Sequence, residues 1–369
     1  MIAAARATPG PVASKRKMGV SGMRGQGVVR RLVESSAGVR ERRAVIPALI
    51  GVAIVLAACS STASSGTANV AAKNRGPTVT LAWDSNPGAG TLPGHAALYE
   101  MQKLGYRIAF TVENGTAATA AALQGGDVNA IQLNGIGVER SIVKGDPFAI
   151  FGQAFGAEEA LVTPTSITSV GQLAGKTIGL ASPVSSSATM VKYSFLKAGI
   201  TVNYAYVGQS SSRADALLTG RIVGTPLALD DIAKITKDAP GKFHILVAYN
   251  KTLPWLMASV YATTRSFYKK DPGFFSTFHR LYAQNISSIY KNPVAFVKKW
   301  KFLLPSYSQS VLDSTTKVLV AAKVWGTDGG IVPKANAIKT VDFGVQTGLL
   351  TSADGHTLIQ TMSKWLLPA

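Results

Sequence analysis

The sequence predicts an α/β fold made of two similar lobes in tandem, followed by helices that pack on the outside of both. From Pro77 onward, short runs rich in β-branched and aromatic residues alternate with helical runs, a pattern typical of a mostly parallel sheet. The same order of strands and helices begins again near Lys176. Only helical patterns follow Asp271, so the last third does not predict a third lobe.

The first of the two repeated segments, between Pro77 and Phe155, is predicted to contain four strands and two helices. The strands are expected at 79–83, 106–112, 129–133 and 148–155, and the helices at 96–104 and 116–124. The second repeated segment is predicted to contain strands at 176–181, 203–207, 225–229 and 243–249, with helices at 186–198 and 213–219. In both segments a glycine, Gly126 or Gly220, ends a helix before the next strand, because glycine readily takes the left-handed conformation.

The C-terminal third predicts five helices, each carrying a helical hydrophobic period. They are expected at 271–290, 293–302, 308–324, 340–348 and 354–365.

The N-terminal region reads as an export signal covering residues 1–58. Basic residues at 40–43 precede an apolar run, 44–58, that is too short to span a bilayer comfortably. The run ends in LAAC, which resembles the lipobox of bacterial lipoproteins, and Cys59 is the only cysteine of the chain. We predict lipidation of Cys59; an ordinary signal peptide or a signal anchor is the alternative.

Residues 59–76 are small and polar, which predicts a flexible tether. The formal net charge of +19 raises the question of nucleic acid, but the basic residues are scattered and not interleaved with aromatics. A basic surface facing an anionic membrane explains the charge better. We expect no nucleic-acid partner.

Hydroxyl-rich helix starts follow several predicted strands. In SPVSSSATM, Ser185 or Ser186 is expected to cap the helix 186–198, whose positions 188, 191, 195 and 198 form an apolar stripe. NGTAAT and SSSRAD occupy comparable places, and Ser212 and Asp215 have the spacing of a capping box. The carboxyl edge of an open α/β sheet is where ligands bind, so these segments predict a cleft for a small polar solute.

Catalytic and metal-binding patterns are sparse. The four histidines are far apart, no GxSxG is present, and GQLAGKT is one residue short of a phosphate loop and precedes its strand. Asp230 and Asp231 could form a polar contact in the cleft, but they also fit the start of the helix IAKITKDA and are interpreted as caps. Trp83 and Trp255 suit either solute stacking or the core. We therefore expect a non-enzyme without metal or cofactor.

The chain resembles the solute receptors of ABC importers in several segments that occur in the same order. These segments are AALQGGDVNAI, GDPFAIFGQAF, SVGQLAGKTIGLASPVSSS, ALLTGRIVG and the helical tail from Asp271. The resemblance is to the nitrate, sulfonate and taurine group, which includes thiamine-precursor binders, with the periplasmic-binding-protein-like II fold. It implies two Rossmann-like lobes joined by two crossing strands, placed at 159–164 and 259–264. It further implies a first lobe of 77–163 and 262–369 and a second lobe of 164–261.

The resemblance also implies a binding site, partners and a location. The implied ligand-binding residues are Ser85, Asn86, Gly88, Gly115, Thr116, Asn134, Gly135, Ser185, Ser186 and Ser187. The implied partners are a small sulfonate-, nitrate- or taurine-like solute and a membrane ABC permease, for an exported monomer that is lipid-anchored to the outer face of the cytoplasmic membrane.

Two features depart from the pattern of an anion binder. No arginine at a helix start is expected to pair with an anionic head group, and Asp84 in WDSNPG would repel an anion. A thiamine-precursor pyrimidine or similar heterocycle, an extracellular enzyme on the same scaffold, and a sensory domain therefore stay open as alternatives.

Overall fold

The structure is a computed structural model that describes residues 75–113, 115–326 and 328–368. The predicted signal peptide, Cys59 and all but the last two residues of the predicted tether lie outside these residues. The first described element, strand β1, begins at Arg75, two residues before the predicted start. No helix in the described ranges is long and apolar enough to cross a membrane.

The first lobe is built on a five-stranded sheet with the strand order β2-β1-β3-β10-β4. The strands are β1 (Arg75–Trp83), β2 (Tyr106–Val112), β3 (Ala130–Leu133), β4 (Phe148–Phe155) and β10 (Ser259–Thr264). Strand β1 is parallel to β2 and β3, whereas β10 runs antiparallel to β3 and β4. The sheet therefore contains four parallel strands and one reversed strand that arrives from far along the chain.

The second lobe repeats this strand order. Its strands are β5 (Glu159–Pro164), β6 (Thr177–Leu180), β7 (Asn203–Tyr206), β8 (Thr225–Ala228) and β9 (Phe243–Ala248). Strand β5 lies antiparallel between β8 and β9, and β6 pairs in parallel with β7. Gly179 N donates to Gly224 O at 2.9 Å and Val223 N to Thr177 O at 2.9 Å, so β6 is joined to the residues before β8. The resulting order, β7-β6-β8-β5-β9, matches the first lobe.

The helices cover both faces of each sheet. The first lobe carries α1 (Leu92–Lys103), α2 (Thr116–Gly125) and α3 (Gly135–Val143), and the second carries α4 (Ser186–Ala198), α5 (Ser210–Leu218), α6 (Leu229–Asp238) and α7 (Tyr249–Thr252). Gly126 at the end of α2 and Gly220 after α5 have φ angles of 82° and 71°, as the sequence predicts for helix-ending glycines.

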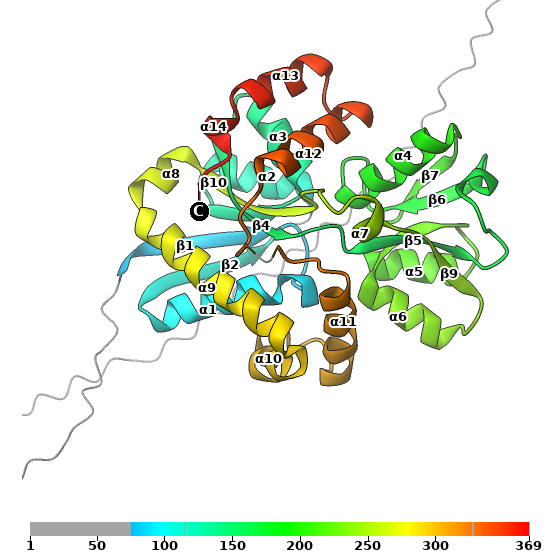
Figure 1. Cartoon of the computed structure of the whole chain (residues 1–369), viewed down its shortest axis with the longest axis horizontal. Helices are drawn as coiled ribbons and strands as arrows, with labels where there is room; N and C mark the ends of the chain where they lie inside the picture. Colours follow the sequence, from blue (N-terminus) through cyan, green and yellow to red (C-terminus); the bar gives the residue numbers. More distant parts are fainter. Residues whose placement is uncertain (1–74, 114, 327, 369) are drawn as a thin grey trace, which may run out of the picture. The chain divides into compact units, whose positions relative to one another are not determined.

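The C-terminal helices pack mainly against the first sheet, one group on each face (Figure 1). They are α8 (Arg265–Lys270), α9 (Pro272–Lys291), α10 (Pro293–Trp300), α11 (Gln309–Ala321), α12 (Lys334–Gln346), α13 (Ser352–Gln360) and α14 (Met362–Trp365). Helices α9, α10 and α11 share a core with α1, whereas α12, α13 and α14 share one with α3. The five predicted C-terminal helices are thus present, with some divided into shorter pieces.

Every predicted strand is present, and the two predicted crossing strands have the predicted bounds, Glu159–Pro164 and Ser259–Thr264. Each is hydrogen-bonded within one sheet, so the chain passes between the sheets just before β5 and returns in the segment between β9 and β10. The predicted α/β class is therefore confirmed. Helix α3 was not predicted.

Candidate functional site

A cavity of about 620 Å³ lies between the two lobes. First-lobe residues following β1, β2 and β3 line one side, and residues following β6, β7 and β8 line the other. These are the carboxyl ends of parallel strands, where loops and helix N-termini are available to a ligand. The volume falls within the range of small-molecule sites.

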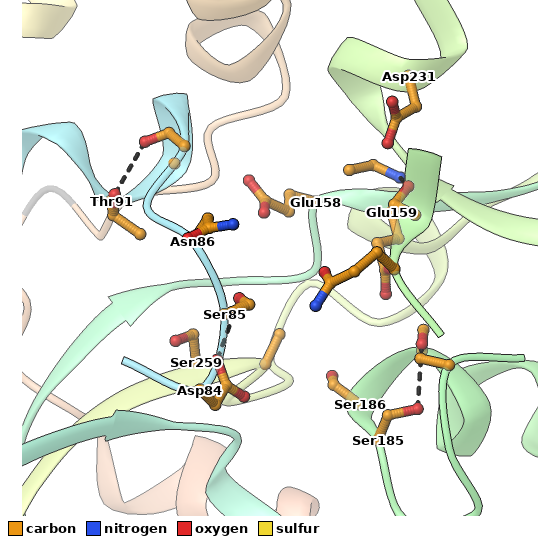
Figure 2. A pocket seen from close by; sticks show the side chains of 18 of the residues that line it. Asp84, Ser85, Asn86, Thr91, Glu158, Glu159, Ser185, Ser186, Asp231 and Ser259 are labelled. Carbon is orange, nitrogen blue, oxygen red and sulfur yellow. Dashed lines mark hydrogen bonds between the residues drawn. The ribbon is translucent and has the colours of Figure 1, made fainter. Parts of the chain in front are cut away.

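The structure brings most of the predicted binding residues together. All of Ser85, Asn86, Gly88, Gly115, Thr116, Asn134, Ser185, Ser186 and Ser187 line the cavity. Gly135 is not among the lining residues: its amide donates to Met257 O at 3.0 Å, and a Cβ at Gly135 would lie 2.8 Å from that oxygen. Figure 2 shows Ser85 and Asn86 on one side of the pocket and Ser185 and Ser186 on the other.

Asn134 lines the cavity as the N-cap of α3. Its Oδ1 accepts from Gly137 N at 2.7 Å, and its Nδ2 donates to Thr116 Oγ1 at 3.2 Å. These bonds fix the side chain and tie the start of α2 to the start of α3.

The serine triplet begins α4 in the predicted way. Ser185 is the N-cap, and its Oγ accepts from Ala188 N at 3.2 Å and lies 3.1 Å from Ser182 O. Ser187 Oγ is 3.2 Å from Ser185 Oγ. Ser186 makes no side-chain hydrogen bond within the described residues, so its hydroxyl is the one of the three left for a solute. Of the predicted apolar stripe, only Ala198 is exposed.

Replacing Ser185 with alanine is expected to lower the free energy of unfolding by about 1 kcal/mol, because the α4 N-cap is lost. Ser186→Ala is the matched control, and we expect its effect to stay within about 0.5 kcal/mol. Denaturant unfolding of the two variants checks this. Equal losses would show that Ser185 does not stabilise α4 through its cap.

Two carboxyl groups of the cavity wall are those of Asp84, directly after β1, and Glu158, directly before β5. Burial, together with smaller contributions from charge repulsion by Asp230 and Glu159, raises the pKa of Glu158 to about 8. Burial also raises the pKa of Asp84 to about 6, although Ser85 Oγ donates to Asp84 Oδ1 at 3.3 Å. The Glu158 carboxylate lies against Gly90, where a Cβ would be 2.4 Å from Oε2. Glycine at position 90 therefore makes room for this carboxylate.

Arg213 and Glu159 form a buried ion pair at the cavity wall. Arg213 Nη2 lies 3.2 Å from Glu159 Oε1, and the two side chains are 2% and 17% exposed. Arg213 also donates to Pro226 O through Nε at 3.1 Å and Nη2 at 2.9 Å, and to Gly208 O through Nη1. Arg213 lies near the start of α5, which begins at Ser210, but these bonds leave no guanidinium nitrogen free for an anionic head group. Its donors are directed to protein acceptors.

The capping roles predicted for three acidic residues were wrong. Asp230 and Asp231 lie in the first turn of α6, but its N-cap is Ala228, with no side-chain capping bond. Both aspartates line the cavity instead. Asp215 does not complete a capping box, because the α5 N-cap is Gln209, three residues before Ser212.

The two tryptophans differ in their surroundings. Trp83 lines the cavity and stacks on Phe110 with ring centroids 4.9 Å apart. Trp255 is not among the lining residues and packs edge-on against Phe343 at 5.8 Å.

Two buried polar side chains of the cavity wall have an atom without a partner in the described part of the chain. Gln132 on β3 donates from Nε2 to Ser259 Oγ at 2.9 Å, but its Oε1 accepts no hydrogen bond. Thr315 Oγ1 on α11 is also unpaired. Sequence reasoning missed both, because each lies inside an element whose pattern reads as core.

Comparison with solved structures shows the fold. The chain is similar to the alkanesulfonate-binding protein SsuA from Xanthomonas axonopodis pv. citri bound to MOPS, with 16% identity and a TM-score of 0.58 over 74% of this chain and 94% of that one. It is similar to the periplasmic aliphatic sulphonate-binding protein SsuA from Escherichia coli, with 14% identity and a TM-score of 0.57 over 79% and 92%. A Candida albicans gene product described as having the generic periplasmic binding protein fold gives 16% identity and a TM-score of 0.60 over 79% and 98%.

No family model matches the chain, and no curated protein matches it in sequence. The chain therefore has the two-lobed periplasmic binding protein fold, with a cavity between the lobes.

Proposed function

We propose that this protein is the extracytoplasmic solute-binding component of an ABC importer. The observation that carries the proposal is the cavity between the lobes, lined from both sides by residues at strand ends and helix starts. The similarity in fold to proteins named as sulfonate-binding, and to the ligand-binding component of an ABC-type import system from Staphylococcus aureus, supports it. A solute held there contacts both lobes and favours their approach, and the importer's permease receives it.

Among the solutes expected from the sequence, a sulfonate or nitrate fits the cavity poorly, because carboxyl groups line it and its one arginine is paired with Glu159. An aminopyrimidine carries nitrogen donors without an anionic group and fits better. Taurine carries an ammonium group that suits the carboxyl groups and a sulfonate that does not. A second candidate is an extracellular enzyme on the same scaffold. The raised pKa of Glu158, about 8, favours it, because such a group can transfer protons at neutral pH. Turnover of a bound solute, followed by mass spectrometry, would show it.

The remaining parts of the chain complete the proposal. We propose that residues 1–58 direct export, that the residues from Cys59 up to β1 tether the folded part, and that the lobes divide in the crossover before β5 and in the segment between β9 and β10. The monomer would then stay lipid-anchored at the outer face of the membrane, beside the permease.

The binding function is tested by native mass spectrometry of the full-length protein purified without denaturation. We expect one small molecule to be retained per chain and to be lost on unfolding. A thermal shift with the recovered compound identifies it as a ligand. A chain that retains nothing and shows no thermal shift with sulfonates, amines or pyrimidines would contradict the function.

Lipidation is tested by replacing Cys59, the only thiol of the chain. We expect Cys59→Ser to abolish metabolic labelling with a radioactive fatty acid and to release the protein from the membrane fraction. Ser60→Ala is the matched control and is expected to keep both. Unchanged labelling of the Cys59→Ser protein would place the modification elsewhere.

A further inference from the structure

The charge of the cavity is opposite to that of the chain. The chain has a formal net charge of +19 and only 19 acidic residues. Five of these acidic residues line the cavity between the lobes, namely Asp84, Glu158, Glu159, Asp230 and Asp231, together with a single basic residue. That basic residue, Arg213, is bonded to Glu159 and to two backbone carbonyls. Glu159 is thereby neutralised. In the described residues none of the other four carboxyl groups forms an ion pair, although Asp231 also interacts electrostatically with Arg213.

Independently of the charges, Gln132 offers a buried hydrogen-bond acceptor that has no donor in the described residues. Its side chain is only 3% exposed, it lines the cavity, and its Oε1 accepts no hydrogen bond. A buried acceptor without a donor costs free energy, which a solute N–H can recover. Gln132 pairs in register with Trp83, the residue before Asp84, so this acceptor belongs to the same wall as the Asp84 carboxyl.

The carboxyl groups lie on both lobes and between them. Figure 2 shows Asp84 on the first-lobe side, Asp231 on the second-lobe side and Glu158 between the two. Glu158 makes no hydrogen bond within the described residues, so nothing in the fold requires its charge. A solute between the lobes meets acceptors from both directions.

We propose that the solute is an organic cation with N–H donors, an ammonium, amidinium or guanidinium group. It is held by Asp84 and Gln132 from the first lobe, by Glu158 between the lobes, and by Asp230 and Asp231 at the start of α6 from the second lobe. This inference rests on the proposed solute-binding function and names its ligand class. A charge-assisted hydrogen bond to a carboxylate is about twice as strong as a neutral one. Trp83 adds an aromatic surface to the same wall.

Two other ligand classes fit these residues less well. A sulfonate would face unpaired carboxyl groups and would find the only lining guanidinium occupied. A divalent metal needs several ligands in one place, and the described residues contain no group of three or more histidine, cysteine, aspartate or glutamate side chains able to hold one.

The test is calorimetric titration of the full-length protein at pH 8 with a panel of small ligands that differ in charge and in their N–H donors. The cations are agmatine and putrescine, and choline serves as a cation without N–H donors. Ethanesulfonate and nitrate are the anions, taurine carries both charges, an aminopyrimidine is the heterocycle, and Mg²⁺ and Zn²⁺ are the metals. Each titration is repeated with Glu158→Gln and with Asp238→Asn. Asp238 is the matched control, because it ends α6 in an exposed position outside the cavity.

We expect agmatine or putrescine to bind at least tenfold more tightly than ethanesulfonate and choline, and Glu158→Gln to weaken that binding about tenfold or more. Asp238→Asn is expected to leave it unchanged. Because Glu158 bonds nothing in the fold, Glu158→Gln should also keep or raise the thermal stability, which separates a binding role from a structural one.

Tighter binding of an anion or a metal than of the amines would overturn the inference while leaving solute binding intact. Binding of agmatine that Glu158→Gln and Asp238→Asn weaken equally would also overturn it. If no member of the panel binds, the inference fails; a solute retained in native mass spectrometry would then show that the binding function survives without it.

Discussion

Replacing Arg213 with methionine is expected to lower the free energy of unfolding by about 3–5 kcal/mol, the usual loss when one partner of a buried ion pair is removed. The guanidinium is 2% exposed and lies 3.2 Å from Glu159 Oε1. Without it, the Glu159 carboxylate keeps its burial but loses its cation, and the carbonyls of Gly208 and Pro226 lose donors. Denaturant unfolding measures the loss.

Two comparisons make the result specific. Adding Glu159→Gln to Arg213→Met should recover part of the loss, because no unpaired charge then remains buried. Lys299→Met removes an exposed ion pair for comparison. Lys299 Nζ lies 3.5 Å from Glu100 Oε1 and the lysine side chain is 62% exposed, so this change should lower the free energy of unfolding by at most about 1 kcal/mol. A similar small cost for Arg213→Met would contradict a structural role of the buried pair.

The affinity for agmatine is expected to rise with pH between about 6 and 8 and to level off above. A cation binds the ionised carboxylate better than the protonated acid, and burial raises the pKa of Glu158 to about 8 and of Asp84 to about 6. Below its pKa, Glu158 holds a proton that the cation must displace, which costs up to about tenfold in affinity per pH unit. Agmatine keeps its charge throughout this range, because amines and guanidines titrate at higher pH.

The charged and titratable groups around Glu158 act in the same direction. Asp230 on α6 and Glu159 on β5 raise its pKa, and Tyr307 before α11 is close enough to feel its charge. Arg213 offsets the charge of Glu159 and also interacts electrostatically with Asp231. Calorimetry in two buffers of different ionisation enthalpy should therefore show proton release on binding near pH 7. Affinity that does not change with pH, or that changes equally in Glu158→Gln, would contradict this assignment.

The same groups set the stability of the empty protein. A carboxyl group whose pKa is higher in the folded than in the unfolded state stabilises the fold only while it stays protonated. We therefore expect the free energy of unfolding to fall as pH rises from about 4.5 toward 8, and Glu158→Gln to reduce that fall. Affinity for the cation and stability of the empty protein should thus change with pH in opposite directions.

The strands could be predicted because each is a short apolar run bounded by turn residues. Helix α3 could not, because Gly135 and Gly137 lower its helix propensity and its residues are buried on several sides. Glu139 is fully buried within it, and burial raises the pKa of this carboxyl well above its usual value.

The hydroxyl and glycine residues of the site could be predicted because each group follows a strand within one segment. Asp84 could be predicted as a group that would repel an anion, but Glu158 and Glu159 could not, because they come from the crossover before β5 and from β5 itself. Asp230 and Asp231 also have the sequence position of helix caps. The observed N-cap at Ala228 shows that neither aspartate caps α6. Arg213 was missed because its partner, Glu159, lies 54 residues away in the sequence.

Hydrogen–deuterium exchange of the full-length protein with and without agmatine at pH 8 tests most directly whether a cation is held between the two lobes. The account predicts slower exchange at the same time in the first-lobe segment 84–91 and in the second-lobe segment 226–234. Protection confined to one lobe, or none in either segment, would contradict it.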